Sequence, residues 1–194
     1  MALVLGLGNP GPRYARTRHN VGWRVLERLV GRWGASPAGE RDTWRAWHAE
    51  RAGRSVDLLL PLTFMNASGA ALESWRESHA LDPAGMLVLV DDVYLPVGSL
   101  RLRTAGSGGG HRGLESLELV VGRDFARLRL GVGAAADPAG LREHVLDEFD
   151  AEEETVVDEA LERAADAVEC WVAEGPLAAM NRFNRRIRKE EPES

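Results

Sequence analysis

Met86-Leu87-Val88-Leu89-Val90-Asp91-Asp92 places five apolar residues in a row and ends them at two carboxylates. Such an unbroken apolar run is typical of a strand buried on both faces, as in the parallel sheet of an α/β protein. A similar run at Leu3–Leu7 is followed by apolar residues at helical spacing from Val21 to Trp33. Buried strands that alternate with helices predict a three-layer αβα sandwich around a mostly parallel sheet.

Further elements are expected on both sides of these strands. A hairpin over 46–52 and 55–60, turning at Gly53-Arg54, makes the sheet mixed. The other expected elements are a helix over 67–75, strands over 99–103 and 127–133, a short helix around 114–121, a long amphipathic helix from Ala151, and a last helix. The 194 residues suit one domain over 1–194, with a basic helix at about 177–188 and an acidic tail at 190–194.

The composition is that of a globular protein. Hydrophobic residues make up 44% of the chain and charged residues 28%, which excludes wholesale disorder. No apolar run reaches the ~18 residues of a membrane helix, and the first residues lack a basic segment and a cleavage site. The single cysteine, Cys170, excludes a disulfide framework and any multi-cysteine metal site. We therefore expect a cytoplasmic protein with no membrane contact.

The charge is unevenly distributed along the chain. The net charge is −6, yet residues 1–146 carry 18 arginines and 15 acids, a balance of +3, whereas 147–194 carry 6 basic residues and 15 acids, a balance of −9. Local patches of arginine, and not the net charge, decide whether a protein contacts phosphates. A nucleic-acid partner is therefore compatible with this sequence.

A glycine motif after the first strand, Gly6-Leu7-Gly8-Asn9-Pro10-Gly11, fits the dinucleotide-binding pattern G-x-G-x-x-G. That pattern needs a helix that begins within the glycines and offers free N–H groups to a pyrophosphate. Pro10 and Pro12 remove two of these donors, and helical spacing resumes only after Asn20. Dinucleotide binding is therefore disfavoured, although it stays open as an alternative.

Four polar residues follow the predicted strands closely enough to meet at one edge of the sheet. Asn9 lies just past the first strand, His19 ends the next loop, Asn66 follows the strand that closes at Pro61, and Asp91 ends the most apolar strand. A histidine with a carboxylate supplies a general base and the group that orients it. No serine or cysteine stands in a nucleophile motif, so these residues indicate hydrolysis by an activated water.

Each of these residues also has a structural interpretation. Asn66 and Asn20 could cap the helices that follow them, Asp91 could be a solvated strand end, and His19 a plain loop histidine. His48 and His79 are better interpreted as surface or packing residues. The glycine run Gly106–Gly110 could be a flexible turn or a phosphate-binding loop, beside which Arg103 and Arg129 could clamp a terminal phosphate.

A set of motifs spread over the whole chain occurs together in this sequence. They are Gly6–Gly11, Tyr14, Thr17-Arg18-His19-Asn20-Val21-Gly22, Pro61-Leu62-Thr63-Phe64-Met65-Asn66, Asp91-Asp92 with Leu95-Pro96, His111-x-Gly113, Arg127–Gly133 and the closing Asn181-Arg182-Phe183. In these motifs the chain closely resembles the bacterial peptidyl-tRNA hydrolases. The resemblance implies an enzyme that cleaves the ester between a peptide and the 3′-terminal ribose of tRNA and so recycles tRNA from stalled translation.

The resemblance also implies roles for individual residues. His19 would be the general base on water, Asp91 would orient it, and Asn9 would position the ester or the water. Met65 and Asn66 would bind the peptide, and Tyr14 and Phe64 would line the cleft. Arg103 and Arg129 would hold the 5′-phosphate, His111 and Arg112 would bind substrate, and the basic closing helix would touch the RNA. The implied partner is peptidyl-tRNA, contacted at its CCA end, 5′-phosphate and acceptor stem by a cytosolic monomer without metal or cofactor.

Four residues depart from the family pattern. The family often has His before the catalytic Asp and Glu after it, where this chain has Val90 and Asp92. The family usually has Lys where this chain has Arg103, and Asn where it has Arg112. The substrate contact of that Asn is therefore lost or replaced in this chain. A non-catalytic RNA-binding protein of the same fold remains the alternative, and hydrolysis of an N-blocked aminoacyl-tRNA separates the two functions.

Overall fold

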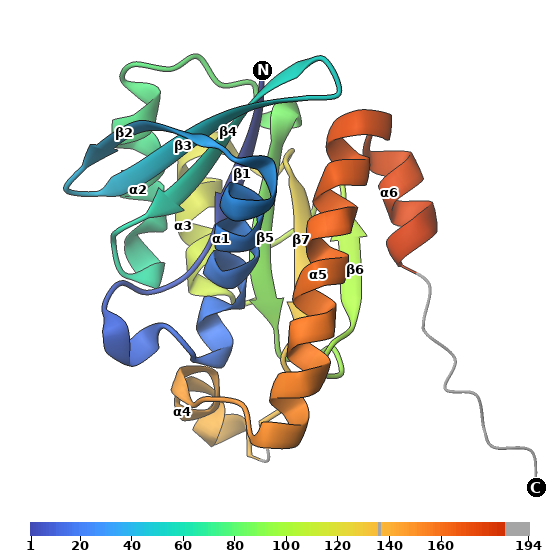
Figure 1. Cartoon of the computed structure of the whole chain (residues 1–194). Coiled ribbons are helices and arrows are strands. Elements are labelled where there is room, and N and C mark those ends of the chain that lie inside the picture. The colour runs from blue at the N-terminus through green and yellow to red at the C-terminus, as the bar shows by residue number, and fades with distance from the viewer. Residues whose placement is uncertain (136, 185–194) are drawn as a thin grey trace, which may run out of the picture.

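The computed structural model describes residues 1–135 and 137–184 and contains a seven-stranded mixed sheet (Figure 1). The strand order is β2-β3-β4-β1-β5-β7-β6. The four central strands, β4, β1, β5 and β7, run parallel, and β2, β3 and β6 pair antiparallel at the two edges. The bounds are β1 Ala2–Gly6, β2 Ser36–Arg41, β3 Trp44–Arg51, β4 Arg54–Pro61, β5 Met86–Asp92, β6 Leu100–Arg103 and β7 Ala126–Gly131.

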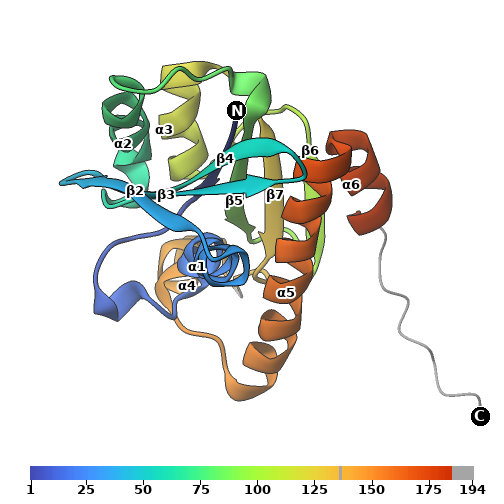
Figure 2. The same cartoon turned by 45° about the horizontal axis from the view of Figure 1, so that its top comes forward.

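Helices cover both faces of this sheet (Figures 1 and 2). One face carries α1 (Val21–Trp33), α5 (Ala151–Glu174) and α6 (Pro176–Phe183), and the other carries α2 (Ser68–Arg76) and α3 (Arg112–Val121). Alternate residues of the central strands point into the two cores: Val4 and Leu87 to the side of α1, Leu5 and Val88 to the side of α2. The predicted three-layer αβα sandwich is therefore confirmed.

The structure differs from the sequence-based expectation at several elements. The edge strand β2 was not expected, because Ser36–Arg41 is exposed throughout and contains Pro37 and Gly39. The short helix α4 (Leu141–Leu146) was not expected either. The hairpin turns at Ala52-Gly53, both with positive φ, and not at Gly53-Arg54. The last helix ends at Phe183, and the rest of the predicted 177–188 helix and the 190–194 tail lie outside the described residues.

A close approach between α1 and the sheet depends on Gly22. A Cβ atom at Gly22 would lie 2.6 Å from the Leu89 carbonyl oxygen and 2.7 Å from that of Leu7. Any larger residue would push the first turn of α1 away from the ends of β1 and β5. Gly22 therefore sets the position of the turn that carries His19, three residues earlier in the chain.

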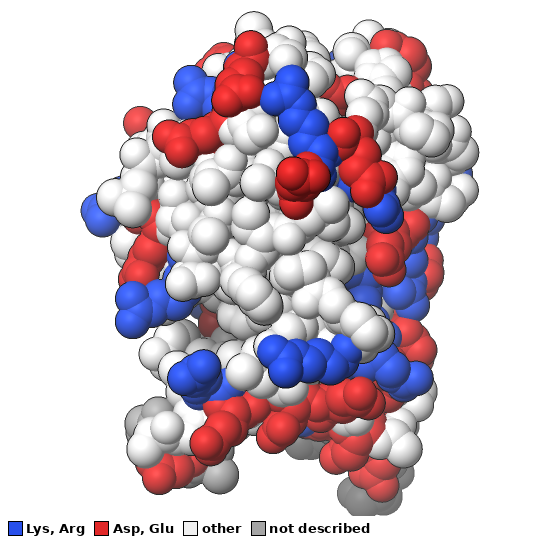
Figure 3. Space-filling model, turned by 90° about the vertical axis from the view of Figure 1, so that its left-hand side faces the viewer, with Lys and Arg blue, Asp and Glu red and all other residues white. Residues whose placement is uncertain are grey.

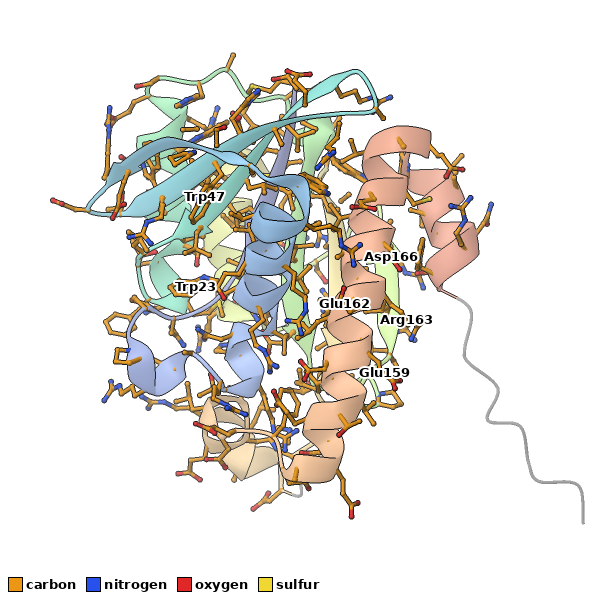
Figure 4. The ribbon with its side chains drawn as sticks, in the orientation of Figure 1. Trp23, Trp47, Glu159, Glu162, Arg163 and Asp166 are labelled. Carbon is orange, nitrogen blue, oxygen red and sulfur yellow. The ribbon has the colours of Figure 1, made fainter. Side chains whose placement is uncertain are left out.

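A ladder of ion pairs joins α1 to α5. Arg24 contacts Glu154 and Asp158, Arg28 contacts Asp158 and Glu162, and Arg32 contacts Glu162, Asp166 and Glu169. The arginines are four residues apart, so they form one stripe on α1, and the acids form the facing stripe on α5. Figure 4 shows Glu162 and Asp166 on α5 beside α1. The ladder fixes the long helix against the helix that begins just after His19.

Candidate active site

A solvent-open cavity of about 900 Å³ lies at the carboxyl ends of the parallel strands. All four polar residues expected at this edge line it: Asn9, His19, Asn66 and Asp91. The crossover geometry of parallel strands brings these loops together, as in other open α/β sheets. The sequence-based expectation that the four residues converge is therefore confirmed.

His19 and Asp91 form a directly bonded pair. The Nδ1 atom of His19 lies 2.9 Å from both carboxylate oxygens of Asp91. Asp91 is only 2% exposed, so it is not a solvated strand end, and His19 is not a plain loop histidine. With the proton on Nδ1 donated to Asp91, the Nε2 lone pair of His19 is the basic position of the ring.

His111 binds the same carboxylate, a contact that sequence reasoning missed. Its Nε2 atom lies 2.9 Å from Asp91 Oδ1, and the His19 and His111 rings are 5.0 Å apart at their centroids. His111 is also the N-cap of α3, where its Nδ1 accepts a hydrogen bond from the Leu114 N–H at 3.4 Å. An acceptor at Nδ1 places the proton of a neutral ring on Nε2, so His111 donates to Asp91.

The pKa values of His19 and Asp91 follow from these contacts. Burial alone would raise the pKa of Asp91, but the charges of His19 and His111 and the hydrogen bonds from both imidazoles hold it well below its usual range. Burial alone would lower the pKa of His19, but the charge of Asp91 and the hydrogen bond to it raise that pKa above 6.5. Asp91 is therefore ionised at neutral pH, and the pKa of His19 lies above that of a free imidazole.

His19, Asp91 and His111 also bring three potential metal ligands within 4.8 Å of one another, the one such cluster among the described residues. Their hydrogen bonds do not suit a metal. Binding a metal at Nε2 of His111 would move its proton to Nδ1, where it would face the Leu114 N–H. The cluster is instead arranged for proton transfer.

Asn9 is held in place by Asn20. The Asn20 side chain accepts from the Asn9 N–H at 2.9 Å and donates to the Asn9 carbonyl at 3.0 Å. Asn9 Oδ1 in turn accepts from the Met65 N–H at 2.9 Å, which leaves the amide NH2 of Asn9 as the donor toward the cavity. Asn20 occupies the N-cap position of α1, as expected, but its side chain makes no cap hydrogen bond and holds Asn9 instead.

Met65 and Asn66 lie in one short 3₁₀ turn, Met65–Ala67, with Met65 buried and Asn66 exposed to the cavity. Asn66 is therefore not the cap of α2, a position that Ala67 occupies. Gly113 allows this turn to pack against α3, because a Cβ there would lie 2.5 Å from the Met65 sulfur. Tyr14 and Phe64 make an edge-to-face contact at 6.2 Å and line the cavity, as expected for a cleft.

The two arginines expected to clamp a phosphate differ in their surroundings. Arg129 donates to Asp92 Oδ2 at 3.2 Å and to the carbonyls of Ser107 and Gly108, so it ties the glycine loop to β5. Arg103 is exposed on the edge strand β6 and makes no ion pair within the described part of the chain. The register pairs Arg101 with Arg129 and Arg103 with Arg127, which places all four on one face of the sheet.

Arg112 begins α3 at the mouth of the cavity. Its side chain is 79% exposed and lies 3.8 Å from Glu115. Arg142, on the unexpected helix α4, lines the same cavity together with Leu141, Val145 and Leu146. The i, i+4 spacing of Leu141 and Val145 was the sequence signal for this helix.

Charged side chains border the uncharged middle of the face seen in Figure 3. In Figure 4, Trp23 and Trp47 lie on the left, which is the side of the molecule that Figure 3 turns toward the viewer.

The basic closing segment is described only as far as Asn184, and its Arg182 pairs with Glu174.

The first loop does not form a dinucleotide site. After Gly8 the chain passes through Pro10 and a 3₁₀ turn, Pro12–Tyr14, and α1 begins only at Val21. Because α1 begins only after the glycines and packs its first turn against Gly6 and Gly8, the arrangement that holds a pyrophosphate is not formed in this loop. Among the described helices, none has the length and apolar character needed to cross a membrane.

Comparisons with known proteins agree on one family. The family model described as peptidyl-tRNA hydrolase matches residues 3–192. Peptidyl-tRNA hydrolases from Synechococcus sp. (strain JA-3-3Ab) and Chloroflexus aggregans are 46% and 45% identical over 186 residues, covering 95% of this chain and 83% and 99% of theirs. The crystal structure of peptidyl-tRNA hydrolase from Acinetobacter baumannii superposes with a TM-score of 0.89 at 33% identity, covering 95% of this chain and 94% of that one. The chain belongs to the peptidyl-tRNA hydrolase family.

Proposed function

We propose that this protein hydrolyses the ester between a peptide, or an N-blocked amino acid, and the 3′-terminal ribose of tRNA. One observation carries the chemistry: His19 Nδ1 is bonded to both oxygens of the buried Asp91 beside an open cavity. This arrangement holds Nε2 of His19 as a base without an adjacent side-chain nucleophile. Family membership and the names of the relatives support peptidyl-tRNA as the substrate.

In the proposed reaction, Nε2 of His19 takes a proton from water while the water oxygen attacks the ester carbonyl. Asp91 holds the ring in this tautomer and stabilises the imidazolium that forms. The amide of Asn9, fixed by Asn20 and Met65, donates to the developing oxyanion, and Asn66, which follows Met65 in the same turn, contacts the peptide. The bond between the acyl carbon and the ribose oxygen then breaks, and the His19 imidazolium returns its proton to the ribose oxygen.

The tRNA would be held outside the reacting centre. Arg103 and Arg129 supply the 5′-phosphate contact, and Arg112 and His111 complete the substrate side of the cavity. Tyr14, Phe64 and Met65 receive the CCA end or the peptide. We further infer a cytoplasmic monomer, which is what the family resemblance implies.

The test compares hydrolysis of N-acetyl-aminoacyl-tRNA and free aminoacyl-tRNA. We expect rapid release from the N-blocked substrate only, and His19→Ala should lose about 10²- to 10⁴-fold in kcat with nearly unchanged tRNA affinity. His48→Ala is the matched control, since His48 also bonds a carboxylate, Asp57, but away from the cavity. Tight tRNA binding without turnover would instead identify a non-catalytic RNA-binding protein.

A further inference from the structure

The carboxylate of Asp91 serves two imidazoles at once. Oδ1 lies 2.9 Å from His19 Nδ1 and 2.9 Å from His111 Nε2, and Oδ2 lies 2.9 Å from His19 Nδ1. A carboxylate that accepts a hydrogen bond from a second donor has less negative charge to offer the first. The strength of the His19–Asp91 hydrogen bond therefore depends on whether His111 also donates a hydrogen bond to Asp91.

The fold fixes the tautomer of His111. Its Nδ1 caps α3 by accepting from the Leu114 N–H, so the lone pair there is engaged. The proton of the ring therefore lies on Nε2, which donates it in a hydrogen bond to Asp91.

We propose that His111 is a positioning residue that takes up part of the hydrogen-bonding capacity of Asp91 and thereby makes His19 a weaker base than an isolated His–Asp pair would. This role goes beyond substrate binding, which is what the family motif implies for His111. Its kinetic test rests on the proposed function of His19, whereas its spectroscopic test does not.

The other charged or titratable groups around the cavity are the same in the wild type and in a variant that changes His111 alone. They are Arg13 and Tyr14 from the first loop, Asp92 from the end of β5, Tyr94 just after it, Arg112 from α3, Arg129 from β7 and Arg142 from α4. Asp92 is paired with Arg129 at 3.2 Å. Arg18, next to His19, points away from the cavity to Glu153 and the Val132 carbonyl.

Two substitutions separate the bond to Asp91 from the helix cap. His111→Asn keeps a good N-cap but is too short to reach Asp91. His111→Gln places an amide N–H near the position of the imidazole Nε2–H and can keep the donor. The tests are the acid limb of kcat/KM against pH on N-acetyl-aminoacyl-tRNA and an NMR titration of the His19 ring in the free protein.

For His111→Asn we expect both midpoints to move to higher pH by about 0.5–1 unit, a part of what one charge-assisted hydrogen bond is worth. Its Tm should stay near that of the wild type, and His111→Gln should titrate like the wild type. An unmoved His19 titration in His111→Asn would overturn the proposal, and so would equal shifts in both variants, which would point to ring volume and not to the bond. If the NMR midpoint moves but no variant hydrolyses the substrate, the proposed function fails and the coupling stands.

Discussion

Arg112 stands where the family resemblance implies an Asn. A guanidinium donates hydrogen bonds and carries a fixed charge, but it cannot accept a bond from a water as an amide oxygen can. Its side chain is highly exposed at the mouth of the cavity and only loosely paired with Glu115. We therefore expect it to contact the ribose-phosphate end of the substrate.

Arg112→Ala should raise KM several-fold with little change in kcat, the pattern of a lost contact that is equally strong in the ground state and the transition state. Arg112→Asn should keep or increase kcat. Steady-state kinetics on one N-blocked substrate measures both, and Arg123→Ala, an exposed arginine paired with Glu118 outside the cavity, is the control. A fall in kcat in both Arg112 variants at constant KM would place Arg112 in the catalytic machinery.

The His19–Asp91 pair also predicts a pH dependence of the wild type. The charge of Asp91 raises the pKa of His19 above 6.5 against the effect of burial, and the base must be neutral to act. Consequently kcat/KM should rise with pH through a midpoint above 6.5. The residual activity of His19→Ala should lack this limb, and an acid limb well below 6.5 in the wild type would contradict the assignment.

The His19–Asp91 pair also contributes to the free energy of unfolding. This contribution changes with pH in the direction opposite to the activity. Because the folded pKa of His19 lies above its unfolded value, its contribution is fully present below about 6.5. It is lost as the pH rises through the folded pKa. Activity and the stability contribution of this histidine therefore change in opposite directions over the same pH window.

Among the elements, α1 depends on the close approach at Gly22. Gly22→Ala would press a methyl group against the carbonyl oxygens of Leu89 and Leu7, and such overpacking costs typically about 1–3 kcal/mol. The first turn would move outward, so kcat should fall together with the free energy of unfolding.

Gly31→Ala on the same helix is the matched control, since a Cβ there meets nothing within 4 Å. It should stabilise the protein by up to about 1 kcal/mol through helix propensity and leave kcat unchanged. Denaturant unfolding and kinetics of both variants check this. Equal effects of the two substitutions would mean that the approach of α1 to the sheet does not position His19.

The elements also show what the sequence could and could not predict. Strands such as β5 and helices such as α1 were predictable, because burial imposes unbroken apolar runs or helical spacing on them. The edge strand β2 was not, since it exists only through pairing with β3 and carries no burial pattern. Likewise, Asn9, His19 and Asp91 were predictable from strand ends, whereas the second partner of Asp91 and the role of Asn20 depend on side-chain hydrogen bonds that no sequence pattern marks.

For the whole molecule, phosphate binding must operate despite a net charge of −6. Arginines line the cavity and the edge of the sheet, and each phosphate that they neutralise releases counterions from the RNA. The affinity for tRNA should therefore fall steeply as the salt concentration rises. Removing Arg103 should reduce the slope of that dependence by about one unit if it neutralises one phosphate.

A double-mutant cycle locates this contact on the tRNA. Removing the 5′-phosphate should weaken binding by the wild type, and it should weaken binding by Arg103→Ala little further, because both changes delete one interaction. Fluorescence titration at several salt concentrations provides the affinities. Fully additive losses would show that Arg103 binds elsewhere on the RNA.

The ladder of ion pairs between α1 and α5 affects the electrostatic potential that a polyanion meets as it approaches the protein. The five acids of the ladder, Glu154, Asp158, Glu162, Asp166 and Glu169, each lie within 4 Å of an arginine of α1, so their charges form tight local multipoles. The net charge of −6 already includes these pairs, and three arginines against five acids leave a charge of −2 on this stripe. Charges more than a Debye length of about 8 Å from the RNA are largely screened, so the arginines at the cavity dominate the orientation in which tRNA first touches the protein.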